Sequence, residues 1–393
     1  MKKIIKTFLA IITLLLIAGV ALFFSHQELF AQKLRTFSGD SNIRWNPPGM
    51  DYSKKTVFII VGNEHTEMFD FMAPYYLFNA TEKTNVFVIA EKKAPVLLVN
   101  SLFILPHYSF AEIDSMHIIP DVIVLPNQTV DFKIQQNPLV VNWIKNKFTG
   151  KNIILSICDG SATAAATGIY DGKPLTTHAS DFEKLKKLFP KPLWVKDISV
   201  TESGNLFSTA GVSNAVQGSL TVIKKLFGEE EMQAVLHEIN YPYNTVNIEH
   251  KSIAVGTATI INVASKVILS KNYHVGVLLK DSINEFTLGS ILDTYVRSYP
   301  KSIKSYSPGG LSVVSKYGLR IYPTGNFLSD KIDELHIMDD KTEGLKELTK
   351  FRKVKFVSYT DMKQYPIDLC LDRIESLYSS KFKNSVKLML DYN

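Results

Sequence analysis

Cysteine is scarce in this sequence: 393 residues contain only Cys158 and Cys370. Two cysteines exclude a disulfide framework and a zinc cluster built on cysteine ligands, although a single Cys158–Cys370 bridge stays open. Low-complexity runs are also missing, and 46% of the residues are hydrophobic, so most of the chain is expected to fold. The net charge of +6 is not gathered into a basic stripe with interleaved aromatic residues. The charge pattern therefore gives no indication of a nucleic-acid partner.

Charged residues are absent from residues 7–24, which read TFLAIITLLLIAGVALFF and follow the basic start MKKIIK. At about 1.5 Å per residue this run spans roughly 27 Å, close to the thickness of a bilayer core. We expect residues 1–25 to form an uncleaved signal anchor, a single-pass helix in the cell membrane. The lysines before this run predict that the N-terminus stays in the cytoplasm and that most of the protein lies outside the cytoplasm. Secretion after cleavage near Ala31 is the alternative.

Residues 26–54 are polar, contain WNPPGM and are typical of a linker. From Lys55 onward, apolar β-branched runs such as KTVFIIVG and DVIVLPN alternate with segments of helical spacing. Continuous apolar strands alternating with helices favour a mostly parallel sheet covered on both faces. The sequence thus predicts an α/β three-layer sandwich over residues 55–245.

An internal repeat indicates a second domain of the same kind over residues 246–393. Phe69 aligns with Phe286 and Leu102 with Leu319, both at an offset of 217 residues. The later half has no strand–Cys–Gly–helix segment after residue 340, so a truncated copy is expected. Thr287 stands where the first half has Asp70. We therefore expect the second copy to be catalytically inactive and to serve packing, dimerisation or partner binding.

The segment 153–166, IILSICDGSATAAA, places Cys158 at a predicted strand–turn–helix corner. Such a corner projects its residue above the carboxyl ends of the strands, where open α/β sheets bind ligands. It also points the first amides of the helix at the thiol, which favours a nucleophilic thiolate. The small residue Gly160 lets the helix approach the sheet. The alternative is that Cys158 is an ordinary small buried residue.

The segment LSICDGSATAAATGIYDGKPLTTHASD resembles the elbow of the DJ-1/PfpI superfamily, in the branch that includes isonitrile hydratases and the sensor domains of AraC-type regulators. FSTAGVSNAVQG, EMFDFMAPYYLF and DVIVLPN resemble further motifs of that branch. The resemblance covers about residues 55–240 in order. It implies a flavodoxin-like sandwich.

The resemblance carries three functional residues to this sequence. Cys158 matches the nucleophilic cysteine, Asp70 the acidic residue that hydrogen-bonds it, and His178 the histidine of the TTH motif. A carboxyl next to a thiol can act as general acid or base, and imidazole moves protons at neutral pH. On the residues alone, Asp70 has a second interpretation as a helix cap, and His178 as a loop histidine.

Two departures from the family pattern concern the site. The first affects the oxyanion hole and the second affects the thiol. Asn127-Gln128 replaces the usual glycine after the strand, so Asn127 joins Gly160 as a candidate pocket residue. Asp159, directly after the cysteine, would oppose thiolate formation if it faced the pocket, and we expect it to point to solvent or to cap the helix. His65 and Glu67 are expected to be solvated loop residues, since their spacing does not define a metal site.

Two functions remain open from the sequence. The first is a cysteine-dependent hydrolase, hydratase or aldehyde-adduct lyase acting on a small molecule through Cys158, Asp70 and His178, without a cofactor or metal. The second is a non-catalytic module that senses a ligand or an oxidant, as the regulator relatives do. No helix-turn-helix pair is evident, so DNA binding is not expected. A homodimer or an intrachain pseudo-dimer is expected.

Overall fold

The computed structural model describes residues 34–39, 46–99, 101–128, 131–132, 134–338, 353–360 and 363–392. The predicted anchor, residues 7–24, lies outside these ranges. Within them, no helix is both long and apolar enough to cross a bilayer.

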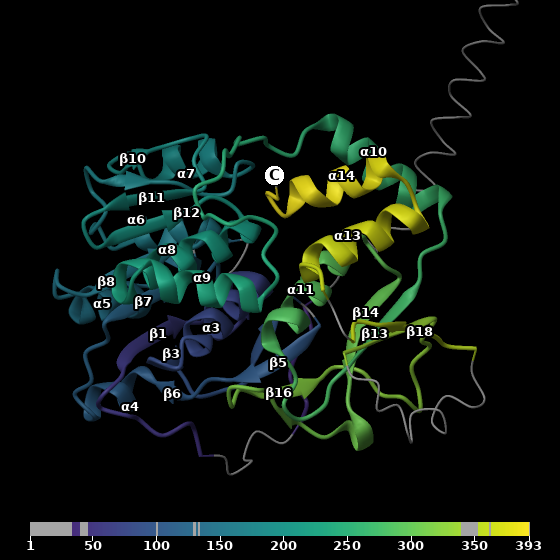
Figure 1. Ribbon diagram of the computed structural model, residues 1–393, viewed down its shortest axis with the longest axis horizontal. Coiled ribbons are helices and arrows are strands. Elements are labelled where there is room, and N and C mark those ends of the chain that lie inside the picture. The colour runs from purple at the N-terminus through teal and green to yellow at the C-terminus, as the bar shows by residue number, and fades with distance from the viewer. Residues whose placement is uncertain are drawn as a thin grey trace, which may run out of the picture.

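The first half is built on a sheet with the strand order β11-β12-β8-β7-β1-β3-β6 (Figure 1). Its strands are β1 (Lys55–Ile60), β3 (Thr84–Ala90), β6 (Tyr108–Ser109), β7 (Val122–Leu125), β8 (Ile153–Ser156), β11 (Val200–Ser203) and β12 (Leu206–Thr209). All neighbours pair in parallel except β11 with β12. The central strands are continuous apolar runs because both faces of the sheet are covered.

Helices cover the two faces of this sheet. They are α3 (Met68–Ala80), α4 (Phe110–Ser115), α5 (Pro138–Lys147), α6 (Ser161–Ala166), α7 (Phe182–Leu188), α8 (Ala215–Phe227) and α9 (Glu229–Glu238). Along β1, Val57 and Ile59 share one core with α3 and α8, whereas Phe58 and Ile60 share another with α5. This alternation is the period of a strand buried on both sides. The predicted α/β sandwich with a mostly parallel sheet is confirmed.

The second half contains a parallel sheet of order β14-β13-β17-β18. Its strands are β13 (His274–Leu278), β14 (Ser302–Tyr306), β17 (Glu334–Ile337) and β18 (Lys355–Ser358), and its helices are α10 (Thr257–Leu269), α11 (Glu285–Val296), α13 (Pro366–Leu377) and α14 (Ser380–Met389). In the same chain order, β3-β1-β7-β8 are neighbours in the first sheet. After residue 340, strand β18 is followed by helices α13 and α14, and the sequence between β18 and α13 contains no Cys-Gly pair.

A third, mixed sheet joins the two halves with the order β15-β16-β5-β4-β2. Its strands are β2 (His65–Thr66), β4 (Val96–Leu98), β5 (Leu102–Leu105), β15 (Val313–Val314) and β16 (Arg320–Pro323); the short pair β9 (Pro174–Leu175) and β10 (Leu193–Trp194) lies apart. Short 3-10 turns complete the described elements: η1 (Ile134–Gln136), η2 (Cys158–Gly160), η3 (Val212–Asn214) and η4 (Pro308–Gly310).

The contact between the halves is self-complementary. Strands β5 and β16 pair antiparallel, with Ile104 opposite Ile321. Helices α3 and α11 pack together at the centre of the molecule, where the rings of Phe69 and Phe286 lie 5.4 Å apart (Figure 1). Both pairs join residues that are 217 positions apart. This is the offset at which the sequence aligns Phe69 with Phe286.

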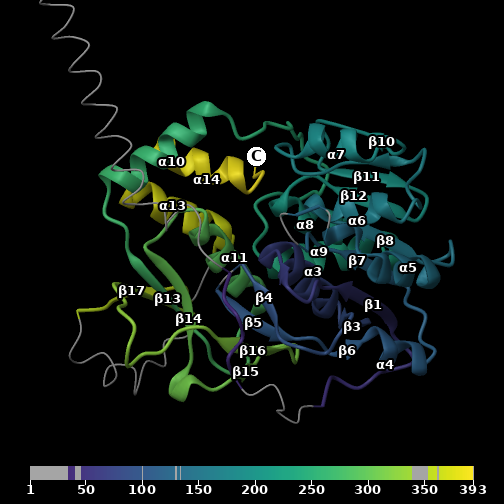
Figure 2. The same ribbon diagram turned by 180° about the vertical axis from the view of Figure 1, so that it is seen from behind.

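The arrangement around this contact is matched on its two sides. Helix α8 packs on α3 and is followed by α9, whereas α13 packs on α11 and is followed by α14. Figure 2 shows these two helix pairs on opposite sides of the central α3 and α11. Helices α8 and α13 begin 151 residues apart, and so do α9 and α14. Helices α8 and α9 are thus arranged around α3 in the same way as helices α13 and α14 are arranged around α11.

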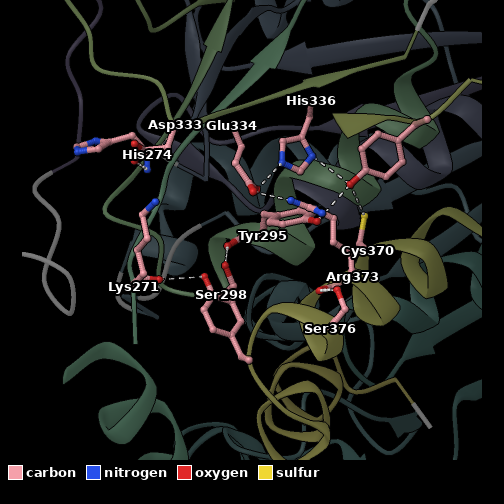
Figure 3. A network of polar contacts seen from close by, with 12 residues as sticks. Lys271, His274, Tyr295, Ser298, Asp333, Glu334, His336, Cys370, Arg373 and Ser376 are labelled. Atoms are coloured by element: carbon pink, nitrogen blue, oxygen red, sulfur yellow. Dashed lines mark hydrogen bonds and ion pairs between the residues drawn. The ribbon is translucent and has the colours of Figure 1, made fainter. Parts of the chain in front are cut away.

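Cys370 lies in a buried polar network between α13 and the second sheet (Figure 3). Its Sγ is 3.7 Å from the hydroxyl of Tyr359, which also lies 3.0 Å from Nδ1 of His336. Arg373 on the same helix donates to Glu334 at 2.6 Å. Burial raises the pKa of Cys370 to about 12. Both cysteines are free, so the bridge that the sequence left open does not form.

Candidate active site

Cys158 occupies the corner between β8 and α6 as the first residue of η2. Its φ of 53° lies in the left-handed region, which a non-glycine residue adopts only when its surroundings enforce it. Its backbone N–H donates to Oγ1 of Thr209 at 3.4 Å, and its carbonyl accepts from Oγ1 of Thr177 at 3.2 Å. These contacts hold the corner in a strained geometry that is typical of a nucleophile elbow.

Gly160 makes the corner possible through close packing. A Cβ at this position would lie 2.0 Å from the carbonyl oxygen of Leu125, inside any allowed contact. Its own N–H donates to the carbonyl of Ile157 at 2.8 Å, which closes the turn. The requirement for glycine here comes from the approach of the turn to β7.

Asp70 lies in the first turn of α3 and is completely buried. The cap of this helix is Glu67, whose carboxylate accepts the N–H of Asp70 at 2.7 Å, so the capping interpretation of Asp70 is wrong. Oδ2 of Asp70 accepts the N–H of Asn127 at 3.1 Å, and Oδ1 has no hydrogen-bond partner among the described residues. Burial, reinforced by the charge of Glu67, raises the pKa of Asp70 well above its usual range. Its environment therefore favours the protonated form of Asp70.

The thiol of Cys158 is also held in its neutral form. The side chain is only 3% exposed. Burial raises the pKa of Cys158 well above its ordinary value, and the nearby carboxyls of Asp70, Asp159 and Glu67 raise it further. Burial thus favours the protonated forms of both the thiol and the nearby acid.

Asp159 does not point to solvent, so that expectation was wrong. It is 8% exposed, and one carboxyl oxygen accepts from Oγ1 of Thr177 at 2.7 Å. Burial and the neighbouring Asp181 raise the pKa of Asp159 to about 8. Because the hydroxyl of Thr177 also donates to the carbonyl of Cys158, Thr177 connects Asp159 to the backbone of the elbow.

His178 is buried beside the same loop. Its Nδ1 accepts the N–H of Ser180 at 3.2 Å, and it also forms a hydrogen bond with the backbone of Met389. Burial, helped by the charge of Arg297, lowers the pKa of His178 to about 4. The imidazole is therefore neutral at pH 7, and its polar contacts go to Ser180 and Met389 and not to the thiol. Its role in proton transfer stays a prediction.

The loop after β7 supports the acid. The carbonyl of Asn127 accepts the N–H of Glu67 at 2.8 Å, and its side-chain oxygen accepts from Gln135 at 2.9 Å. Since the N–H of Asn127 is already donated to Asp70, this amide orients the acid in the closed site. The predicted oxyanion role of Asn127 remains untested.

Sequence reasoning missed a group of residues at the contact with the second half. Arg297, at the end of α11, pairs with Glu67 at 3.1 Å and with Asp293 at 2.5 Å. Although burial opposes the effect, Arg297 lowers the pKa of Glu67 and keeps it ionised. Glu67 is buried, contrary to the expectation of a solvated residue, and His65 is half-buried. No local pattern in the sequence joins Glu67 to a residue 230 positions away.

The turn after α14 is hydrogen-bonded to residues of both halves. Ser213 donates through its N–H to the carbonyl of Leu390 at 3.0 Å, and through its hydroxyl to the carbonyl of Asp391 at 2.8 Å. Nε of Arg297 donates to the carbonyl of Met389 at 3.2 Å. The turn at residues 389–391 is therefore bound to both halves of the chain.

Among the described residues, no cluster of three or more His, Cys, Asp or Glu side chains has the geometry of a metal site. The site thus consists of a buried thiol, a neutral carboxyl and an ion pair that joins the two halves.

The chain is similar to several known proteins. The model of the DJ-1/PfpI family matches residues 55–225. An isonitrile hydratase of Pseudomonas putida is 25% identical over 175 residues, which cover 44% of this chain and 74% of that protein. Protein dj-1beta of Drosophila melanogaster is 29% identical over 142 residues, 36% of this chain and 73% of the relative. The crystal structure of Drosophila melanogaster DJ-1beta superposes with a TM-score of 0.43 at 24% identity, covering 47% of this chain and 97% of that one.

Proposed function

Because residues 55–225 of this chain belong to the DJ-1/PfpI family, we propose that the protein is a cysteine-dependent enzyme that hydrates or hydrolyses a small electrophilic molecule. Cys158 is the nucleophile and Asp70 the general acid. The observation that carries the proposal is the left-handed corner at Cys158 beside a completely buried, neutral Asp70 with one unpartnered oxygen.

The chemistry follows from two neutral partners. When Sγ of Cys158 bonds to an electrophilic carbon, Asp70 gives its proton to the substrate and receives the proton of the thiol. Water then adds to the same carbon, the carbon–sulfur bond breaks, and the thiol regains a proton. The net change is the addition of one water to the substrate, and no oxidant or reductant is needed. A carbon–nitrogen multiple bond suits this sequence because it can accept the proton as sulfur attacks.

The relative named isonitrile hydratase supports this substrate class. At 25% identity it does not fix the substrate of this chain, since related folds carry different reactions. Isonitriles are therefore the first substrates to test, followed by activated amides and α-oxoaldehydes.

The test is turnover by the full chain of cyclohexyl isocyanide to the formamide, followed by chromatography. Cys158→Ala should lower turnover by at least about a thousandfold, with a change in Tm of less than about 2 °C. Cys370→Ala, at the buried thiol of the second half, is the matched control and should keep turnover. Turnover that survives Cys158→Ala would contradict the proposal. Absence of turnover on all three classes, with stoichiometric oxidation of Cys158 by dilute peroxide, would favour the sensing function instead.

We also propose that residues 7–24 anchor the protein in the cell membrane with the folded part outside the cytoplasm. The support is the length of the apolar run and its lysine-rich flank. In cells expressing the full chain, alkaline carbonate should leave the protein in the membrane fraction. Release into the soluble fraction would favour the cleaved, secreted form.

The second half is proposed to be a degenerate copy that takes the place of a dimer partner within the chain. The matching strand orders and the pairing of Ile104 with Ile321 support this view. Analytical ultracentrifugation of the detergent-solubilised chain should therefore give a monomer at micromolar concentration. A concentration-dependent dimer would show that a further interface exists.

A further inference from the structure

A cavity of about 710 Å³ opens at the carboxyl edge of the second sheet, away from Cys158. This volume is within the range of small-molecule sites. Its walls come from the ends of three strands, the loop before α11, the start of α13 and the end of α9; they include Leu278, Lys280, Asp281, Ser282, Ile283, Asn284, Phe286, Thr287, Met338, Tyr359, Thr360 and Pro366, with Tyr76, Glu238, Ile239 and Asn240 from the first half.

The cavity is the counterpart of the thiol site. Ser358 pairs with the last residue of β17 as Ser156 pairs with the last residue of β7, which puts Thr360 at the position of Cys158. Thr287 receives a capping bond at the start of α11 just as Asp70 does at the start of α3. The end of α9, from the first half, borders this cavity.

The two counterparts differ in what they contain. The thiol site has a nucleophile and an acid and is closed by the turn after α14. At the matching positions the cavity has the hydroxyls of Thr360 and Thr287, which cannot act as a strong nucleophile and acid there. An open cavity that lacks both groups is suited to binding without chemistry.

One wall of the cavity is fixed in advance by hydrogen bonds. The hydroxyl of Tyr76 donates to Glu238 at 2.6 Å and accepts from Nδ2 of Asn284 at 3.1 Å. Lys316 pairs with the same carboxylate of Glu238 at 3.1 Å. The side chain of Glu238 nevertheless stays 37% exposed, so it can still meet a ligand. Groups held in place before binding lose little conformational entropy when a ligand arrives.

The remaining lining sets the ligand class. Leu278, Ile283 and Phe286 give the cavity an apolar floor, whereas Lys280, Asp281 and Glu238 give its rim charges of both signs. A ligand that carries only a positive or only a negative charge would lie next to a rim residue of the same charge. We propose that this cavity binds a small zwitterion with an apolar body, of the class of the apolar α-amino acids. The carboxylate faces Lys280 and the ammonium faces the acidic part of the rim.

The test uses three probes that share one aliphatic chain. L-norleucine carries both charges, hexanoate lacks the ammonium, and pentylamine lacks the carboxylate. Calorimetry with the full chain should give one norleucine per chain and affinities at least tenfold lower for the other two. Lys280→Gln should weaken norleucine at least fivefold and leave pentylamine unchanged, whereas Lys301→Gln, an exposed lysine outside the cavity, should change neither.

Cys158→Ala separates this site from the thiol site, because norleucine should bind the variant as it binds the parent chain. Loss of binding in this variant would place the ligand at the thiol site and overturn the proposal. Equal affinity for the three probes, or no binding of norleucine, would also overturn it. Circular dichroism of each variant before titration ensures that a lost signal is not lost folding. None of these outcomes depends on whether the thiol site has the proposed activity.

Discussion

At the scale of single residues, buried carboxyls near the thiol and the scarcity of positive charge around them determine the properties of the site. Asp70, Asp159 and Glu67 all raise the pKa of Cys158, and the ion pair of Arg297 is made with Glu67 and Asp293, not with the thiol. A thiol in such surroundings reacts slowly by itself. Under the proposed function, its reactivity depends on proton transfer to and from Asp70.

Replacement of Asp70 by Asn tests this dependence. The amide keeps the shape and can still accept the N–H of Asn127, but it cannot donate a proton to the substrate. We expect turnover to fall by about 10²–10⁴-fold. Asn cannot ionise, so the contribution that the carboxylate of Asp70 makes to the raised pKa of Cys158 is lost, and that pKa should fall. The rate of iodoacetamide alkylation against pH measures this shift, and an unchanged profile would mean that Asp70 does not interact with the thiol.

Asp159 predicts how stability depends on pH. Its pKa is about 8 in the folded chain, above the value of about 3.9 that an unfolded chain gives. The unfolded state therefore loses this proton first, so the contribution of Asp159 to folding stability is full below pH 4 and is lost as the pH rises to about 8. The parent chain should lose stability between pH 5 and pH 8. Asp159→Asn should reduce this loss in the free energy of unfolding by on the order of 1–3 kcal/mol. Urea unfolding at the two pH values measures this difference, and parallel changes in both proteins would contradict it.

At the scale of elements, the elbow depends on contact between backbones. Gly160→Ala would put a Cβ 2.0 Å from the carbonyl of Leu125, and neither backbone segment can yield without breaking β7–β8 pairing. We expect a loss of about 2–4 kcal/mol of stability, in the range of strongly overpacked positions. Gly256→Ala is the matched control, because the nearest atom to its Cβ is 4.0 Å away. Equal stability of the two variants by thermal unfolding would contradict this account.

Sequence reasoning succeeded where local patterns determine structure. The apolar runs of β1 and β7 and the corner at Cys158 could be predicted because strand period and turn chemistry act within a few residues. The burial of Asp159 could not be predicted, since the Thr177 hydroxyl that donates to its carboxylate comes from a different segment. Arg297 could not be found either, because only the packing of α3 against α11 brings it to Glu67.

At the scale of the whole molecule, each half completes the other. Arg297 and the end of α14 reach the thiol site from the second half, and the end of α9 reaches the cavity from the first. The contact between Phe69 and Phe286 joins the two halves. The thiol site and the cavity, which differ in their side chains, therefore belong to one folded unit. We therefore expect the second half to influence access to the thiol.

Ser213 allows this control to be measured. Its hydroxyl bond to Asp391 helps to hold the turn at residues 389–391 over the site. Removal of one such bond by Ser213→Ala costs about 0.5–1.5 kcal/mol, which raises the open population by about two- to tenfold. Alkylation of Cys158 by iodoacetamide should accelerate by the same factor with little change in Tm. Ser376→Ala, which removes an exposed serine hydroxyl on α13, is the control and should leave the rate unchanged. If Ser213→Ala alkylates no faster than the parent chain, the thiol is reached by a route that does not involve the turn after α14.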